Sequence, residues 1–167
     1  MLPYLSADDN YHLNLAVTSI IISCLAESKA STPKLNNERL HIYMYLIRNP
    51  VKLNLVLNDL GKGNVSIYAQ DSFSVASISG NVDLLFDRSS LKAIISTLIS
   101  EEIVEVVYKK NDGFFYKLSS KGNELVKSID GNFFEDVRKY CDFLKPTLSL
   151  TVSRINKSLN GIIKKGI

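Results

Sequence analysis

Residues 103–129 read IVEVVYKKNDGFFYKLSSKGNELVKSI, and this stretch decides the fold. Its first part, residues 103–109, is rich in β-branched side chains, and residues 114–118 form a second run with strand-forming character. Asn111, Asp112 and Gly113 lie between the two runs. We expect a tight turn there, and Asp112 and Gly113 are strong hairpin residues because the favoured two-residue turns need positive φ angles. The sequence therefore predicts a β-hairpin.

Helices are expected on both sides of this hairpin. Ser119 suits the cap of a helix over residues 120–129, since a serine side chain accepts hydrogen bonds from the free amides of a first turn. Before the hairpin, Asp87 or Ser89 can cap a helix with a buried apolar stripe. The order helix, strand, turn, strand, helix across residues 89–129 is typical of a winged helix. The stripe of the preceding helix consists of Leu91, Ile94, Ile95, Leu98 and Ile99.

Apolar residues at helical spacing predict further helices in the N-terminal half. The first covers residues 12–30. A second ends near Arg48, because Pro50 disfavours the helical conformation for the residue before it. We expect a third helix over residues 51–60, and residues 61–80 are typical of a loop or an irregular strand region.

The C-terminal residues complete a mostly helical α+β protein. A helix is expected over residues 131–145, punctuated by Pro146, and an amphipathic helix from residue 147 to the end. The helical N-terminal half and the winged-helix module would form one body, residues 1–130. Residues 131–167 would then be a C-terminal helical extension.

The composition is that of an ordinary globular domain. The 167 residues are 46% hydrophobic and 22% charged, which argues against a disordered chain. The best candidate for a membrane span, residues 16–25, is interrupted by polar side chains and is shorter than the roughly 20 apolar residues that a span needs. Cys24 and Cys141 suit buried thiols in a reducing compartment. We therefore expect a soluble, cytoplasmic protein that is not associated with a membrane.

The net charge of +3 is unevenly distributed along the chain. Residues 1–60 carry 5 basic and 5 acidic side chains, and residues 61–130 carry 8 and 9. Residues 131–167 carry 7 and 3. The basic surplus therefore belongs to the C-terminal segment, and the expected winged helix has none.

Two stretches resemble known families. Residues 116–125, YKLSSKGNEL, resemble the strand-to-helix corner of winged-helix proteins. Residues 39–56, RLHIYMYLIRNPVKLNLV, resemble the helix and Asn-Pro corner in the middle components of bacterial ABC-three-component defence systems, the group that includes the Lamassu systems against phages and plasmids. The second resemblance implies a non-enzymatic adaptor in an antiviral defence complex. Its partners would be an SMC-like or Rad50-like ATPase and an effector nuclease of the same operon.

The terminal helix is the candidate partner interface. Its apolar stripe must be buried, so the helix either folds back on its own domain or docks in a groove of a partner. The lysines beside the stripe suit an acidic partner or nucleic acid, and a solvated helix face is equally consistent with them. The candidate interface residues are Val152, Ile155, Lys157, Leu159, Ile162 and Lys164.

A winged-helix DNA-binding transcription regulator is the alternative function. The expected reading helix, residues 89–100, carries Lys92 as its only charged side chain and has no Asn, Gln or Arg for base edges. Lys109 and Lys110 at the hairpin tip are the best candidates for contact with nucleic acid, although lysines at strand ends also protect exposed edges. The sequence therefore favours a protein partner over direct, sequence-specific DNA binding.

The sequence offers little for catalysis. His12 and His41 lie at or within apolar helices, which favours structural roles. A nucleophile pair of Cys24 with either histidine lacks an identifiable orienting carboxylate. Asp8 and Asp9 are adjacent acids without a third ligand, and no glycine-rich phosphate loop has the required spacing. We expect a protein that is not an enzyme and takes no cofactor, metal or small-molecule substrate.

Overall fold

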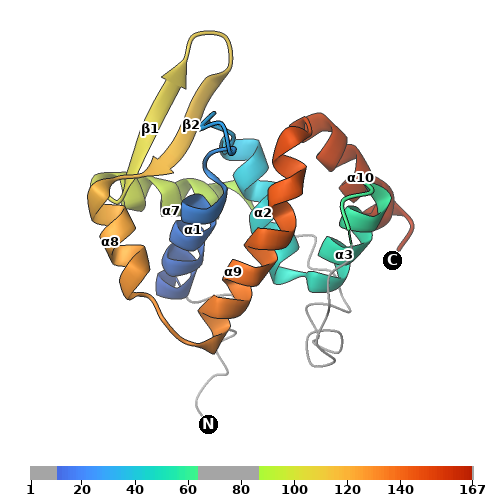
Figure 1. Cartoon of the computed structure of the whole chain (residues 1–167), viewed down its shortest axis with the longest axis horizontal. Helices are drawn as coiled ribbons and strands as arrows, with labels where there is room; N and C mark the ends of the chain where they lie inside the picture. Colours follow the sequence, from blue (N-terminus) through green and yellow to red (C-terminus); the bar gives the residue numbers. More distant parts are fainter. Residues whose placement is uncertain (1–10, 64–86, 167) are drawn as a thin grey trace.

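The computed structural model describes residues 11–63 and 87–166 (Figure 1). This part of the chain is mostly helical with one antiparallel hairpin, which confirms the predicted α+β class. Most of the expected loop, residues 64–80, lies outside the described residues, as do Asp8 and Asp9. The elements are α1 (Tyr11–Leu25), α2 (Asn37–Arg48), α3 (Pro50–Asp59), α7 (Arg88–Ser100), β1 (Val104–Lys109), β2 (Gly113–Leu118), α8 (Ser120–Ser128), α9 (Asn132–Leu144), the 3-10 helix η2 (Lys145–Ser149) and α10 (Val152–Lys164).

Helix α1 lies at the centre of the helical body (Figure 1). It packs most extensively against α9 and also contacts α2, α7, α8 and β2. Ile20, Ile21 and Ile22 are all fully buried, although consecutive positions point to different sides of a helix. The core therefore surrounds α1. Among the helices that the structure describes, none combines the length and the apolarity needed to cross a membrane.

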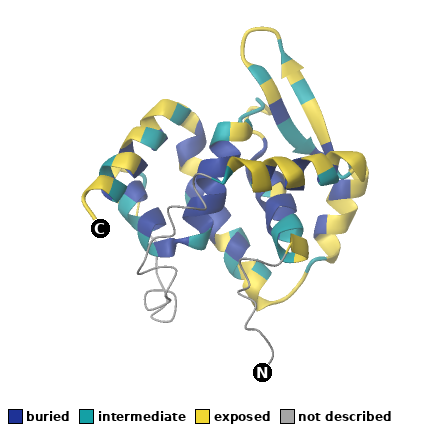
Figure 2. Ribbon diagram, turned by 180° about the vertical axis from the view of Figure 1, so that it is seen from behind, coloured by how far each residue is buried: buried dark blue, intermediate teal, exposed yellow. Residues whose placement is uncertain are grey.

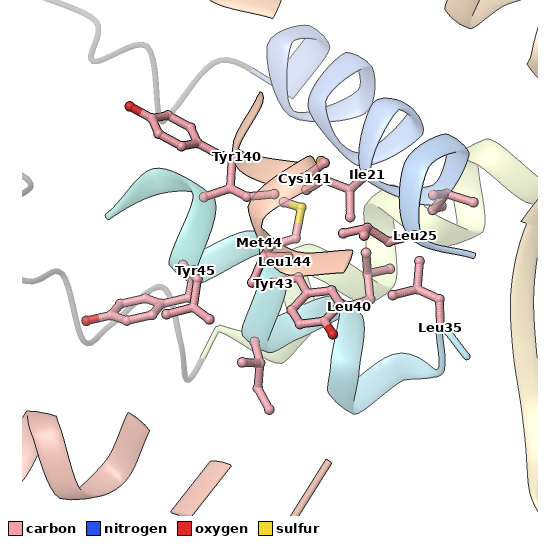
Figure 3. Close-up of a cluster of buried hydrophobic side chains, with 14 of the residues drawn as sticks. Ile21, Leu25, Leu35, Leu40, Tyr43, Met44, Tyr45, Tyr140, Cys141 and Leu144 are labelled. Atoms are coloured by element: carbon pink, nitrogen blue, oxygen red, sulfur yellow. The ribbon is translucent and has the colours of Figure 1, made fainter. Parts of the chain in front are cut away.

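The first helix is shorter than predicted, because the chain turns back on itself after Leu25. Glu27 and Pro33 form an isolated antiparallel bridge, and Ser31 within this turn has a left-handed φ of 56°. The turn delivers Leu35 to the core, where it is fully buried beside residues of α2 (Figure 3). Helical periodicity alone did not reveal this turn.

Helices α2 and α3 meet at the predicted corner. α2 ends at Arg48, and Pro50 occupies the first position of α3, where its missing N–H costs no helical hydrogen bond. Between them, Asn49 is buried and its side-chain amide donates to the carbonyl of Tyr45 at 2.8 Å. The Asn-Pro sequence therefore stops one helix and starts the next within a single buried residue.

The hairpin projects away from the helical body (Figure 1). Its register pairs Val104 with Leu118 and Lys109 with Gly113, so three residues connect the strands. The predicted hairpin is therefore confirmed, and its connection lies one residue earlier than the tight turn expected at Asn111, Asp112 and Gly113. Gly113, the residue that follows this loop, has a positive φ of 90°. Within the loop, the Asp112 amide donates to the carbonyl of Lys109 at 3.1 Å. A three-residue loop followed by such a glycine is a common hairpin connection.

Side-chain caps begin the helices on both sides of the hairpin. Asp87 accepts a hydrogen bond from the amide of Ser90 at 3.1 Å and so begins α7, which decides between the two predicted caps. Ser119 accepts from the amide of Gly122 at 2.9 Å and begins α8 as predicted. Both caps satisfy amides that would otherwise lack a partner.

The C-terminal helices share the core of the N-terminal half. α9 packs against α1 and α2, and α10 packs against α3 and α2. Cys141 and Leu144 of α9 belong to the same cluster of buried apolar side chains as Tyr43 of α2 (Figure 3). Leu159 of α10 belongs to this cluster as well. The division of the chain at residue 130 stays a prediction.

Candidate interaction surfaces

The hairpin carries an exposed apolar face. Side chains alternate between the two faces of a strand pair, so Val106, Tyr108 and Phe114 share one face in this register. Tyr108 and Phe114 lie directly opposite each other, are each 62% exposed, and have ring centroids 5.1 Å apart. Figure 2 shows that the tip of the hairpin is exposed. Contiguous exposed apolar side chains of this kind mark interaction sites.

The hairpin tip is also basic. Lys110 is exposed and Lys109 is half-exposed at the end of β1. Neither forms an ion pair with another residue in the described ranges, whereas Lys117 on β2 lies 3.6 Å from the carboxylate of Glu105. The contact of Lys109 and Lys110 with nucleic acid stays a prediction.

The expected reading helix, α7, offers few groups for DNA. Arg88 begins this helix, but its guanidinium pairs with the carboxylate of Glu38 on α2. This hydrogen-bonded pair lowers the pKa of Glu38 below its ordinary value. Lys92 is the charged side chain that remains exposed along the rest of the helix, and its other exposed polar residues are serines. The helix surface therefore lacks the bidentate donors that distinguish bases.

The apolar stripe of the terminal helix lies inside the chain's own core. Ile155, Leu159 and Ile162 are 1%, 0% and 8% exposed, and α10 packs on α3. Val152 is half-buried. Of the two alternatives that the sequence left open, folding back is therefore the one observed. Ile155 and Leu159 are enclosed in the core, whereas Ile162 also lines a groove between α10 and the end of α3, and the contact of these residues with a partner stays a prediction. Exposed Lys157 belongs to the opposite side of α10, as does Lys164 near its end, and their contact with a partner stays a prediction.

A basic groove runs along the exposed side of α10. Arg154, Lys157 and Lys165 line it on one side, and Asp59 at the end of α3 lines the other. The hydroxyl of Ser158 donates to Asp59 at 2.6 Å, which joins the two helices. Within the described part of the chain, none of these three cations forms an ion pair. The sequence prediction named lysines of this helix, Lys157 among them, but not Arg154 as a contact, because the groove depends on how α10 docks on α3.

Gly161 is one of the residues that line this basic groove. A glycine inside a helix costs about 1 kcal/mol relative to alanine. A Cβ atom added to Gly161 would have no neighbour within 4 Å, so packing within the described chain does not require the glycine. Its absence of a side chain leaves the helix backbone open to close approach from outside.

A buried arginine fixes the position of α10. Arg39 is 5% exposed, and its guanidinium donates to the hydroxyl of Tyr43 at 3.0 Å. It also donates to the carbonyls of Thr147 and Leu150, at 3.2 and 2.6 Å. α2 is thereby joined to η2 and to the residues that lead into α10. Sequence patterns gave no signal for these contacts, because Thr147 and Leu150 each lie more than 100 positions from Arg39 along the chain.

The two thiols are in contact although they are far apart in the sequence. Cys141 on α9 is buried, and Cys24 on α1 is half-buried. Hydrogen bonding between the two thiols lowers the pKa of Cys24, and it raises the pKa of Cys141 together with burial. The charged groups that act on Cys24 are Lys145, Asp142 and Arg138, and neither histidine is among them.

The histidines lie in different environments. His12 is exposed beside the ring of Tyr11, whereas His41 is 4% exposed within α2. His41 lines a cavity of about 280 Å³ between α2 and α7, together with Tyr45 and Arg48. In residues 11–63 and 87–166, no three His, Cys, Asp or Glu side chains are grouped so that they could hold a metal ion.

Comparison with known proteins identifies one family. The family model described as "ABC-three component (ABC-3C) system Middle Component 4" matches residues 25–157. The matched region runs from the end of α1 through the hairpin and into α10, and so includes most of the chain. No curated protein and no solved structure matches the chain.

Proposed function

Because the chain belongs to the family of middle component 4 of ABC-3C defence systems, we propose that it is a non-enzymatic adaptor subunit of such a system. It links an SMC-like or Rad50-like ATPase to an effector nuclease of the same operon. Within the ABC-3C systems, the proposal assigns it to the Lamassu type.

The observation that supports this proposal is that the two candidate interaction surfaces are separate. An adaptor must contact two partners at once, and the exposed hairpin and the basic groove on α10 lie on different sides of the body (Figure 1). The hairpin offers aromatic side chains, which are enriched at protein interfaces. The groove offers three cations beside a glycine and therefore fits an acidic protein surface.

The contacts of Arg39 hold α10 in one orientation, and this favours simultaneous binding of partners at the hairpin and at the basic groove. Through the carbonyls of Thr147 and Leu150 it fixes the chain that enters α10, and a fixed helix presents its groove in one orientation. Binding then costs less conformational entropy than it would for a mobile terminal helix.

The alternative function is a winged-helix transcription regulator that binds DNA. The order of α7, the hairpin and α8 favours it, as do Lys109 and Lys110 at the tip. The composition of α7 counts against it, because serines and a single exposed lysine suit neither base readout nor strong phosphate binding.

Two experiments test the adaptor proposal. Co-expression with the neighbouring ATPase and nuclease should give one complex that contains the tagged chain and both partners. A chain that purifies alone beside both partners would sink the proposal. A salt series of DNA binding separates the alternatives, because a regulator prefers one sequence at every salt concentration, whereas an adaptor binds weakly without sequence preference or not at all.

A further inference from the structure

The two outer edges of the hairpin differ. On β2, the amide of Tyr116 donates to the carbonyl of Leu35 at 2.9 Å, so the turn before α2 occupies part of this edge. On β1, the backbone groups of Val106 and Tyr108 point away from β2, because alternate residues of an antiparallel strand face its partner. No backbone bond within the described ranges reaches these outward groups.

An open edge of this kind is a template for another strand. Natural proteins usually protect such edges with charges, proline or a covering segment. On β1, the charged side chains Glu105 and Lys109 lie on one face, whereas Val106, 44% exposed, and Tyr108, 62% exposed, lie on the other. Backbone pairing at this edge would continue the hairpin into a larger sheet.

We propose that the occupant is β1 of a second copy of this chain. The two strands run antiparallel, and the two-fold axis passes between their Val107 residues. Glu105 of each copy then lies opposite Lys109 of the other, on one face of the joined sheet. Val106 of each copy lies opposite Tyr108 of the other on the second face. The result is a four-stranded antiparallel sheet across the dimer.

Charge complementarity selects this register. Opposite charges and aromatic–β-branched pairs are both stabilising when directly opposed across antiparallel strands, and here each pair occurs twice. A register centred on Val106 would instead place Glu105 opposite Val107 and leave the charge unmatched. The symmetric contact also closes on itself, as an isologous interface must.

The base of the hairpin provides a second complementary contact. In the proposed register, Lys110 of one copy lies opposite Val104 of the other. Val104 lines a hollow beside the end of α7 that also contains Glu102 and Glu105. Lys121 lines the same hollow, but its ammonium donates to the carbonyl of Glu101 at 2.8 Å. The basic tip of each hairpin thus reaches an acidic base on the other copy.

The dimer would also enlarge the exposed aromatic face. Val106, Tyr108 and Phe114 of both copies would lie on the same side of the joined sheet. The inference does not rest on the adaptor function, because the contact uses only this chain.

Disulfide cross-linking tests the register. The two Val107 residues would form a non-hydrogen-bonded pair with Cα atoms about 4.5 Å apart, within the range that a disulfide spans. We expect Val107→Cys to give a covalent dimer under mild oxidation by oxidised glutathione. Val106→Cys, on the same strand, should cross-link far more slowly, because its two copies lie diagonally across the interface. The unsubstituted chain controls for Cys24 and Cys141. Equal rates for the two variants, or no dimer from Val107→Cys, would overturn the proposal.

Charge reversal tests the same contact without cysteine chemistry. Glu105→Lys and Lys109→Glu should each weaken dimerisation roughly tenfold or more in sedimentation velocity, because like charges then face each other. An equimolar mixture of the two variants should dimerise again, since each copy then supplies the charge that the other needs. Thermal melting of each variant verifies folding, because Glu105 also pairs with Lys117. A mixture that stays monomeric, or an unsubstituted chain that stays monomeric throughout a concentration series, would overturn the proposal.

Discussion

A Cβ atom on Gly122 would lie 2.2 Å from the carbonyl oxygen of Ile103. The amide of Ser119 donates to the same oxygen at 2.9 Å, so this carbonyl joins the start of α8 to the chain just before β1. The neighbouring atom belongs to the backbone and cannot rotate aside. The glycine in the sequence SSKG is therefore required by the close packing of α8 on the base of the hairpin.

Gly122→Ala should lower the free energy of unfolding by about 2 kcal/mol, within the range for overpacked sites. Gly161→Ala is the matched control, because its new methyl group would meet nothing within 4 Å. There the gain in helix propensity should raise stability by up to about 1 kcal/mol. Urea denaturation measures both changes. Shifts of the same sign in the two variants would contradict this account of Gly122.

Arg39→Met should destabilise the protein by about 2–4 kcal/mol, because the carbonyls of Thr147 and Leu150 lose their buried donors. Hydrogen exchange should increase first at the start of α10. The control, Lys157→Met, removes an exposed cation from α10 itself and should change the free energy of unfolding by less than about 0.5 kcal/mol. Equal effects of the two substitutions on unfolding would show that Arg39 does not fix α10.

Asp87→Ala should lower stability by about 1 kcal/mol at neutral pH through loss of the α7 cap. Hydrogen bonds from Ser90 and Ser89 lower the pKa of Asp87 in the folded state. A carboxylate with a lowered pKa stabilises the fold above its ordinary pKa, about 3.9, and this contribution is lost as the pH falls through the folded value. The difference in the free energy of unfolding between the unsubstituted protein and Asp87→Ala should therefore shrink in acid. Urea unfolding at several pH values measures it, and a difference that persists in strong acid would exclude this mechanism.

Cys24 should react with iodoacetamide at a lower pH than an ordinary thiol, because the hydrogen bond from Cys141 lowers its pKa. Cys141→Ala should move the midpoint of the alkylation profile to higher pH without unfolding the protein. Mass spectrometry of the modified peptide identifies the site. A profile that is unchanged by Cys141→Ala would mean that the two thiols do not interact in solution.

Local features of this fold could be predicted from the sequence, and long-range ones could not. The Ser119 cap and the Asn49–Pro50 corner depend on residues within a few positions of each other, and both predictions were confirmed. The hairpin turn lies one residue earlier than predicted, because its place depends on the strand register, which the residues at the turn do not determine alone.

The same distinction applies to the interaction surfaces. The exposure of the lysines of α10 could be predicted from the amphipathic pattern of this helix. Whether Ile155 and Leu159 face a partner or the chain's own core depends on α3, and helical periodicity is the same in both cases. The contact of Cys24 with Cys141 likewise depends on how α1 packs against α9.

The proposed function requires that this chain physically joins an ATPase to an effector in an ABC-3C system. Native mass spectrometry of the purified chain, the ATPase and the effector nuclease, alone and in every combination, tests it most directly. The account predicts a complex of the chain with each partner, and an assembly of all three that forms only when the chain is present. An ATPase and an effector that associate equally well without the chain would contradict it.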